Sequence, residues 1–457
     1  MKLERLWAWM KAGDDSEEGS RRLRWRLFWV GLAIRILYIL VVRPYHVRPL
    51  NDHFQFGWEA GRIARALVTG YGYADPFTGH SGPTAWLAPL YPLLMAAVFK
   101  VFGVYTALSA FVLLAINSVL SAAMAPAIYE IAHRCYDSRG LGRRVALWSG
   151  WIWTLYPAAM QYAVRWFWEM SLTTCAFTWI IVIALRLRRI GEDDESQRHN
   201  DLLLWSVFGL LWAAIFLANP SVILVLPVTA IWILMGSRSG SQLTQGLGRA
   251  ALAGVLFLAC VTPWVYRNWV VFHAFIPTRG NLGAEMYQSM LPSNEAFSWG
   301  TTIPAEVDAP EYKRYRQMGE LAYVRERNVE ANALIAANHG RFVRYAIKRV
   351  YFFWFGVPKP EDHGILVEAT RRLNYCFICT AALMGLALSL RQRVPASGLF
   401  TAIFLILPAP YYIVTVQARF RHPIEPIMTV LIVFLFQSAT SSKKQSPSHE
   451  ATGALAR

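Results

Sequence analysis

Residues 145–187 read VALWSGWIWTLYPAAMQYAVRWFWEMSLTTCAFTWIIVIALRL, and this stretch decides the fold class. Two apolar runs, 145–166 and 171–187, meet at the short sequence RWFWE (165–169). An apolar run of about 20 residues matches the roughly 30 Å hydrocarbon core of a bilayer. Tryptophan gathers at the boundary between membrane and water, so the turn is expected at that boundary. The stretch therefore predicts a pair of transmembrane helices.

The whole chain has the composition of a membrane protein. Of its 457 residues, 55% are hydrophobic and only 16% are charged, whereas about a quarter of the residues in a soluble domain are charged. Most arginine clusters behind the net charge of +16 fall in short loops between apolar runs. No soluble segment combines a lysine–arginine stripe with stacking aromatics, which argues against nucleic acid as a partner. We therefore expect an all-α, polytopic transmembrane helical bundle.

About ten apolar runs are candidate spans. The first follows a charged stretch and precedes no A-x-A cleavage site, so it is expected to be a retained span. The runs divide the chain into a cytoplasmic N-terminal segment (1–26), a transmembrane domain (27–438) and a cytoplasmic tail (439–457) that is expected to be disordered. The predicted spans are 27–43, 105–132, 145–166, 171–187, 201–217, 221–236, 250–266, 373–390, 397–414 and 427–438.

Arginine-rich loops set the predicted orientation. The loops 133–144 and 186–199 belong in the cytoplasm by the positive-inside rule, and both chain termini belong there with them. The first long loop, 44–104, and the large segment 267–370 then lie on the opposite, external side of the membrane.

Three segments on the external side are expected to lie along the membrane surface. Residues 54–69 and 341–356 are amphipathic, and the second of them is rich in basic and aromatic residues. The apolar segment 86–102 is short and carries two prolines and a lysine. A crossing at 86–102 would move the arginine-rich loop 133–144 outside, so we expect this segment to lie at the interface.

Ionisable residues that are far apart in the sequence are predicted on this same external side. Ionisable groups at membrane depth are costly and usually face a cavity or one another. The pattern therefore predicts a polar cavity that opens outward. Its candidate residues are Asp52, His53, Glu59 and His80 in the first loop, Arg165 and Glu169 in the turn, Arg267, and Arg419, Arg421, His422 and Glu425 before the last span.

Simpler roles for the three acids remain open. Asp52 can be a solvated loop residue, and Glu59 can form an ion pair with Arg62 one helical turn away. Glu169 can likewise pair with Arg165 at the end of a span. A catalytic role would be favoured over these simpler roles only if the acids converge on a cationic partner.

The stretch QARFRHPIEP (417–426) places Arg419, Arg421 and His422 in a dense positive patch just outside a span. Arginine forks bind phosphate oxygens in a bidentate manner, and the two prolines keep the local backbone out of regular helix. A contact with anionic lipid headgroups is an alternative. A carboxylate that faces such a motif suggests a reaction with a lipid phosphate as leaving group and an aspartate as base. No glycine-rich nucleotide motif is present.

Three stretches resemble a known class of enzymes. Residues 48–103 (RPLNDHFQFGWEAGRIARAL, GYGYADP and GPTAWLAPLYPLLMAAVFKVFG), PWVYRNWVVFHAFIPTRGNLGAEMY (263–287) and RFRHPIEPI (419–427) are similar to bacterial integral-membrane glycosyltransferases of the GT-C class. Relatives in that class include protein O-mannosyltransferases and the aminoarabinose transferase of lipid A, which belong to glycosyltransferase family 39 or are similar to it. The resemblance implies a GT-C bundle in the bacterial inner membrane and a polyprenyl-phosphate-sugar donor. It also implies inverting transfer, on the periplasmic side, to a lipid, glycan or protein acceptor.

The resemblance also implies roles for individual residues. Asp52 corresponds to the catalytic base in the first external loop, and Glu169 matches a second acid at the end of the third span. Arg419 and Arg421, with His422, would contact the donor phosphate. Glu59 is expected to be structural.

No cofactor is expected. The usual acidic pair of the first loop is Asn51-Asp52 in this chain, which argues against a bridging divalent metal. Cys376 and Cys379 form a CxxC inside an apolar run, and we interpret them as two small residues on one helix face.

Two other functions fit parts of the pattern. A flippase or transporter of lipid-linked sugars would need polar groups through the membrane, where Arg35 is the main candidate. An O-antigen ligase or polymerase would use a pyrophosphate-linked donor and essential residues in the large external segment, such as Arg325, Arg327 and His339.

Overall fold

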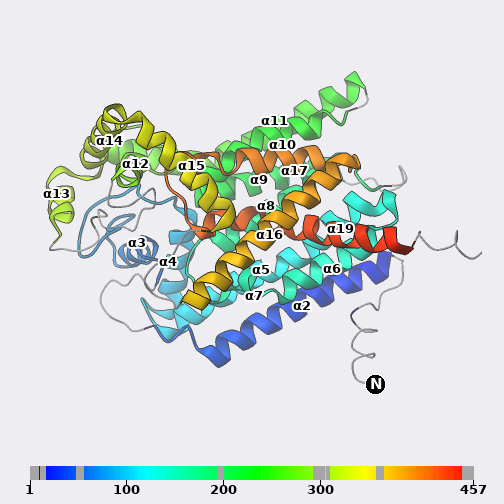
Figure 1. Ribbon diagram of the computed structural model, residues 1–457. Helices are drawn as coiled ribbons and strands as arrows, with labels where there is room; N and C mark the ends of the chain where they lie inside the picture. The colour runs from blue at the N-terminus through cyan, green and yellow to red at the C-terminus, as the bar shows by residue number, and fades with distance from the viewer. Residues whose placement is uncertain are drawn as a thin grey trace, which may run out of the picture.

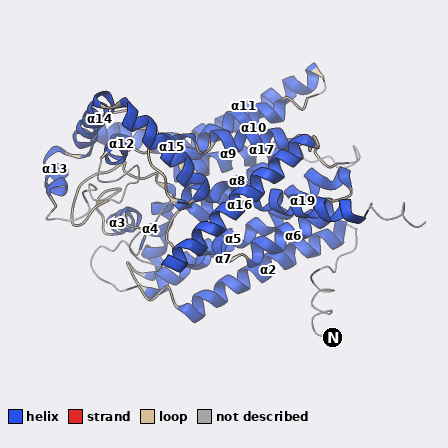
Figure 2. Ribbon diagram, viewed as in Figure 1, coloured by secondary structure: helices blue, strands red, loops and turns tan. Residues whose placement is uncertain are grey.

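A computed structural model describes residues 10, 17–47, 56–192, 200–237, 239–291, 304, 309–356 and 365–444. Regular structure in these ranges is helical, and the only pairing of extended backbone within them is one bridge between Ala74 and Pro83. Figure 2 shows the helices and no strand among the described residues. The all-α prediction is confirmed.

A bundle of elongated helices forms the body of the molecule (Figure 1). Its described helices are α2 (Glu17–Val42), α5 (Ala107–Tyr136), α6 (Gly142–Leu155), α7 (Pro157–Val164), α8 (Met170–Leu187), α9 (Asp201–Ala218), η3 (Pro220–Leu224), α10 (Val225–Leu234), α11 (Gly240–Phe272), α16 (Ile365–Arg391), α17 (Ser397–Ile406), α18 (Ala409–Ile413), η5 (Ala418–Ile424) and α19 (Glu425–Lys444). The remaining described helices are α3 (Glu59–Val68), α4 (Leu90–Phe102), η2 (Asp137–Arg139), α12 (Leu282–Met290), α13 (Pro310–Met318), α14 (Glu320–Ala337) and α15 (His339–Phe355).

Seven described helices are long and apolar enough to cross a membrane, so the chain is a multi-pass membrane protein. They are α2, α5, α8, α9, α11, α16 and the last described helix, α19 with η5. The other three predicted spans correspond to shorter helices, each beside a proline: Pro157 lies between α6 and α7, Pro220 begins η3 directly after α9, and Pro408 lies between α17 and α18. Proline cannot donate the helical hydrogen bond, and its ring clashes with the preceding turn.

One end of the bundle carries the helices that do not cross it. In Figure 1, α3, α4, α12, α13 and α14 gather at this end, which we name the site end. The helix α4 has 13 residues, or about 20 Å at 1.5 Å per residue, which is too short for the bilayer core. It packs against α3, in agreement with the expectation that 86–102 does not span.

The opposite end, which we name the arginine end, is held together by ion pairs between bundle helices. Glu130 on α5 accepts hydrogen bonds from Arg24 on α2 at 3.1 Å, from Arg134 at 2.9 Å and from Arg186 on α8 at 2.6 Å. Asp201, the first residue of α9, pairs with Arg249 on α11 at 2.8 Å. The arginine-rich loops predicted on one side of the membrane therefore lie at one end of the bundle.

Glycines let two pairs of bundle helices approach backbone to backbone. A Cβ at Gly209 on α9 would lie 2.3 Å from the carbonyl oxygen of Ala253 on α11. A Cβ at Gly385 on α16 would lie 2.2 Å from the carbonyl oxygen of Leu431 on α19. Small residues at such crossings are typical of helices that pack inside a membrane, where close van der Waals contact replaces hydrophobic driving force.

Candidate functional site

Arg419 forms the cationic centre of the candidate site. It lies in the irregular turn η5, which contains Pro423 and cannot continue as α-helix. Its guanidinium lies over the ring of Trp168 at 4.2 Å and near the ring of Phe420 at 5.2 Å. Flanking rings fix the plane of a guanidinium and leave its N–H edge available to acids or phosphate oxygens.

Glu169 lies beside Arg419 at the start of α8. Burial raises the pKa of Glu169 above the usual value, and the nearby Arg419 works in the opposite direction. The side chain of Glu169 makes no capping hydrogen bond to the start of α8, so its carboxylate is not committed to capping this helix. Arg165 is exposed. Of Arg165 and Arg419, it is therefore Arg419 that interacts electrostatically with Glu169.

The turn between α7 and α8, which contains Phe167 and Glu169, packs against the first external loop. Phe56 is fully buried and stacks on Phe167, with ring centroids 5.1 Å apart. Gly57 has a positive φ of 81°, and a Cβ there would lie 2.2 Å from the carbonyl oxygen of Phe167. Only glycine fits this approach. The described chain resumes here after Asp52 and His53, which both lie outside the described residues.

Two further carboxylates interact with the same cation. Glu59, the first residue of α3, and Glu285 on α12 both interact electrostatically with Arg419. Burial raises the pKa of Glu285, while Arg279 lowers it from a distance of 3.9 Å between its Nη2 and Oε1 of Glu285. Three acids from three separate parts of the chain thus interact electrostatically with Arg419.

Arg421, His422 and Glu425 form a separate, mutually bonded group. Arg421 is 2% exposed, donates to Oε1 of Glu425 at 3.2 Å, and lies 4.0 Å over the ring of Tyr375. Nδ1 of His422 is 2.8 Å from Oε2 of Glu425, and the imidazole stacks on Trp153. The charges of this group are matched within it, so Arg419 is the residue of the motif that is oriented toward the acids.

Arg267 and His80 both bond to residues of the first external loop. Arg267 donates to the carbonyl oxygens of Thr84 at 2.7 Å and Tyr73 at 2.6 Å, which ties the first loop to the end of α11. Nδ1 of His80 is 2.9 Å from Oδ2 of Asp75 within the first loop. Among the described residues, the groups that affect Arg419 electrostatically include Glu59 and Glu169 but neither His80 nor Asp75.

Glu320 joins the two external segments. Its carboxylate accepts hydrogen bonds from the hydroxyl of Thr84, from the backbone N–H of Ala85 at 2.6 Å and from the hydroxyl of Tyr315 at 2.8 Å. The residue is buried. We name this group the loop clamp: it holds the first external loop against α13 and α14. The sequence alone gave no reason to single out Glu320, Glu285 or Arg279.

We expect Glu320→Gln to change the pH dependence of stability. Burial raises the pKa of Glu320, against the opposing effect of its three hydrogen bonds. Because the folded-state pKa is above the unfolded value, the stabilising contribution is complete below the unfolded value, about 4.3, and is lost as pH rises through the folded value. Thermal unfolding in detergent across this window should show that decline in the parent protein and a flatter profile in the variant.

Glu326→Gln is the matched control for this experiment. The pKa of Glu326 is lowered by its hydrogen bond with Arg314, so its contribution has the opposite sign and is lost as pH falls. Parallel pH profiles for the parent protein and Glu320→Gln would contradict the assignment of the slope to the loop clamp.

Two of the four residues named for the alternative functions, Arg35 and Arg327, are buried and bonded within the protein. Arg35 is fully buried in α2 and donates to Oγ of Ser121 at 3.0 Å and to the carbonyl oxygen of Gly31 at 2.9 Å. Arg327 is 2% exposed and pairs with Glu330 at 2.8 Å. Arg325 and His339 are exposed.

The described residues contain no group of three His, Cys, Asp or Glu side chains arranged to hold a metal ion. The acids that affect Arg419 interact electrostatically with two cations, its own guanidinium and, for Glu169 and Glu285, that of Arg279. Within the described part of the chain the residues therefore fit an anionic ligand better than a cation, and we derive no step through a metal.

No protein-family model matches this sequence, and no curated protein matches it significantly. Solved structures do match. The apo oligosaccharyltransferase of Archaeoglobus fulgidus is 12% identical, with a TM-score of 0.54 over 92% of this chain and 51% of that one. The same enzyme in complex with zinc and sulfate is 10% identical, with a TM-score of 0.52 over 91% of this chain and 50% of that one.

A third structure, ArnT from Cupriavidus metallidurans bound to undecaprenyl phosphate, covers 95% of this chain and 82% of that one. Its identity is 12% and its TM-score is 0.35, too low to carry an argument. This chain spans about half the length of the oligosaccharyltransferase structures that it matches. Similarity at this level of identity shows the fold, which is the GT-C fold.

Proposed function

We propose that this chain is an integral-membrane glycosyltransferase that moves a sugar from a polyprenyl-phosphate donor to an acceptor hydroxyl, with inversion. One observation carries the proposal: Arg419, between aromatic rings at the site end, interacts with carboxylates from three separate parts of the chain. A fixed cation suits a lipid phosphate, and an acid beside it suits an acceptor proton. The GT-C fold supports the same reaction class, since the structures matched at a TM-score above 0.5 are of an oligosaccharyltransferase.

The proposed reaction needs one base and one cation. The acceptor oxygen forms a bond to C1 of the sugar as the bond from C1 to the phosphate oxygen breaks. The phosphate leaves with the electron pair and its growing charge is stabilised by Arg419. The acceptor proton passes to Asp52, which is four residues before Phe56 in the sequence. Glu169 supplies a negative charge that interacts with Arg419.

The location follows from the same proposal. We place the protein in the bacterial inner membrane, with the arginine end and both termini in the cytoplasm and the site end in the periplasm. The arginines of the arginine end then satisfy the positive-inside rule. A donor that is anchored in the membrane by its lipid would present its phosphate at the level of Arg419.

The test is sugar transfer by the purified full-length chain in lipid vesicles. Radiolabelled polyprenyl-phosphate sugar should lose its label to an acceptor and release polyprenyl phosphate. Glu368→Gln is the matched control, because this acid is at the start of α16 and pairs with Arg371 at 2.8 Å. Its transfer rate should equal that of the parent protein.

Other products of the same assay would replace the proposal. Labelled lipid that crosses the bilayer with its sugar attached would indicate a flippase. Transfer only from a pyrophosphate-linked donor would indicate a ligase or polymerase. Mass spectrometry of the lipid that co-purifies with the protein distinguishes the two phosphate linkages directly.

A further inference from the structure

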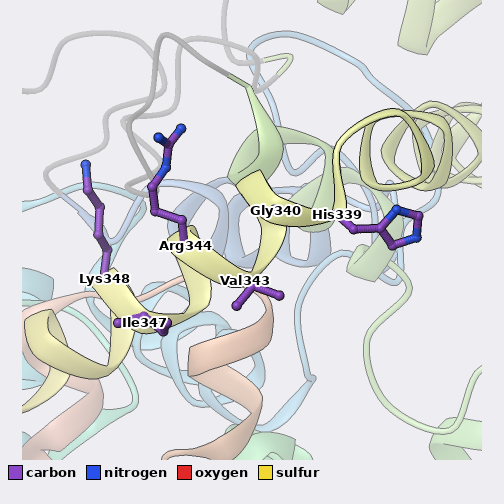
Figure 3. Close-up of a pocket in the computed structure, with 6 residues that line it drawn as sticks. All are labelled: His339, Gly340, Val343, Arg344, Ile347 and Lys348. Carbon is purple, nitrogen blue, oxygen red and sulfur yellow. The ribbon is translucent and has the colours of Figure 1, made fainter.

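The helix α15 has a cationic outer face that the proposed reaction does not use. Its sequence, HGRFVRYAIKRVYFFWF, contains no aspartate or glutamate between His339 and Phe355. A shallow groove runs along this face (Figure 3). The residues that line it are His339, Gly340, Val343, Arg344, Ile347 and Lys348.

The inner face of α15 is fixed to the bundle. Arg349 is fully buried and donates to three backbone carbonyl oxygens, those of Ser289 at 2.6 Å, Ile413 at 2.9 Å and Tyr412 at 3.4 Å. Tyr345 and Phe353 are buried on the same face. These contacts set the rotation of the helix, so the face that carries the groove points away from the bundle.

The outer face presents two parallel stripes. The apolar stripe has exposed side chains one and two turns apart: Val343 is 54% exposed, Ile347 is 65% exposed and Tyr351 is 54% exposed. Arg344 and Lys348 are one turn apart beside it, and in Figure 3 they extend to one side of the helix. This is the pattern of a helix that lies in a membrane surface, with its apolar stripe among the acyl chains and its cations at the phosphates.

The position of α15 agrees with this pattern. The helix follows α14, which lies at the site end, and it packs against the bundle helices α16 and α18. In Figure 1 it lies between the external helices and the bundle. A bilayer around the bundle would have its polar boundary at this level.

We propose that the outer face of α15 binds the headgroups of anionic phospholipids in the leaflet at the site end. The cations attract the phosphates, and the exposed apolar side chains bind the adjacent acyl chains. Each lysine or arginine near an anionic surface contributes about 1 kcal/mol, or roughly a fivefold change in affinity. This surface goes beyond the proposed transfer reaction and does not depend on it.

Native mass spectrometry of the full chain in detergent tests the proposal. Phosphatidylglycerol should bind more tightly than phosphatidylcholine. Arg344→Gln combined with Lys348→Gln should weaken the first bound phosphatidylglycerol by about 25-fold, from about fivefold for each cation. Lys313→Gln combined with Arg316→Gln, two exposed cations on α13, should leave that affinity unchanged.

Hydrogen exchange locates the lipid without any substitution. Phosphatidylglycerol, but not phosphatidylcholine, should protect backbone amides at 339–351. Equal binding of the two lipids, protection elsewhere, or equal weakening by the α13 pair would each overturn the proposal. Displacement of the lipid by millimolar inorganic phosphate would identify a free-phosphate site instead and would also overturn it.

Discussion

Replacing Asp52 by Asn is expected to lower kcat for sugar transfer by roughly 100- to 10,000-fold, the usual contribution of a positioned general base. The amide has nearly the same size as the carboxylate but cannot accept the acceptor proton. The measurement is the initial rate of label transfer from polyprenyl-phosphate sugar in vesicles. Donor binding should change little, because the donor phosphate is assigned to Arg419.

Glu59→Gln is the decisive comparison for this first result. Glu59 is the acid of the first external loop that interacts electrostatically with Arg419 and Glu169 in the described chain. If Asp52 is the base, Glu59→Gln should lose much less activity than Asp52→Asn. The reverse order would transfer the role of base to Glu59 and contradict the assignment of Asp52.

Replacing Arg419 by Gln is expected to lower kcat/KM for the donor by roughly 100- to 1,000-fold. Loss of one preorganised donor to a developing charge has an effect of this size. Arg419→Lys should recover only part of the rate, because an ammonium keeps the charge but loses the planar stack on Trp168 at 4.2 Å and the bidentate fork. Rates at several donor concentrations separate the effects on kcat and KM.

Arg372→Gln is the control for the second result. Arg372 is half exposed at the site end and pairs with Glu368 at 2.8 Å, so its loss should leave donor kinetics unchanged. Melting temperatures of all variants check that the bundle is intact. Full activity of Arg419→Gln in a folded protein would remove Arg419 from the donor site.

The spans could be predicted because the membrane limits what a helix can contain. Runs of about 20 apolar residues have few other uses, so every predicted span is matched by a helix or by a pair of shorter helices. The shorter helices beside Pro157, Pro220 and Pro408 were harder to anticipate. Proline is tolerated in membrane helices when neighbours satisfy the freed backbone groups, so its presence alone does not define a break.

The site was only partly accessible to the same reasoning. Glu169 and Arg419 were found because charge at a membrane boundary is conspicuous. The bonds among Arg421, His422 and Glu425 depend on the local path of η5, which the sequence does not specify.

The acids of the large external segment gave no comparable signal. That segment is polar throughout, so neither periodicity nor membrane depth distinguishes Glu285 or Glu320 from its neighbours. Their partners Arg419 and Thr84 are distant in the sequence, and only the tertiary structure brings each pair together.

The contact at Gly57 has a consequence for finding distant relatives. Sequences as divergent as the 12% identity seen here cannot be recognised by overall similarity. A steric requirement can persist where chemistry and composition drift. In any chain where the first loop crosses the turn before Glu169 in this way, the residue at the position of Gly57 must lack a Cβ. A Cβ at Gly57 would lie 2.2 Å from the carbonyl oxygen of Phe167. A glycine at the position of Gly57 is therefore expected in any chain that has this crossing.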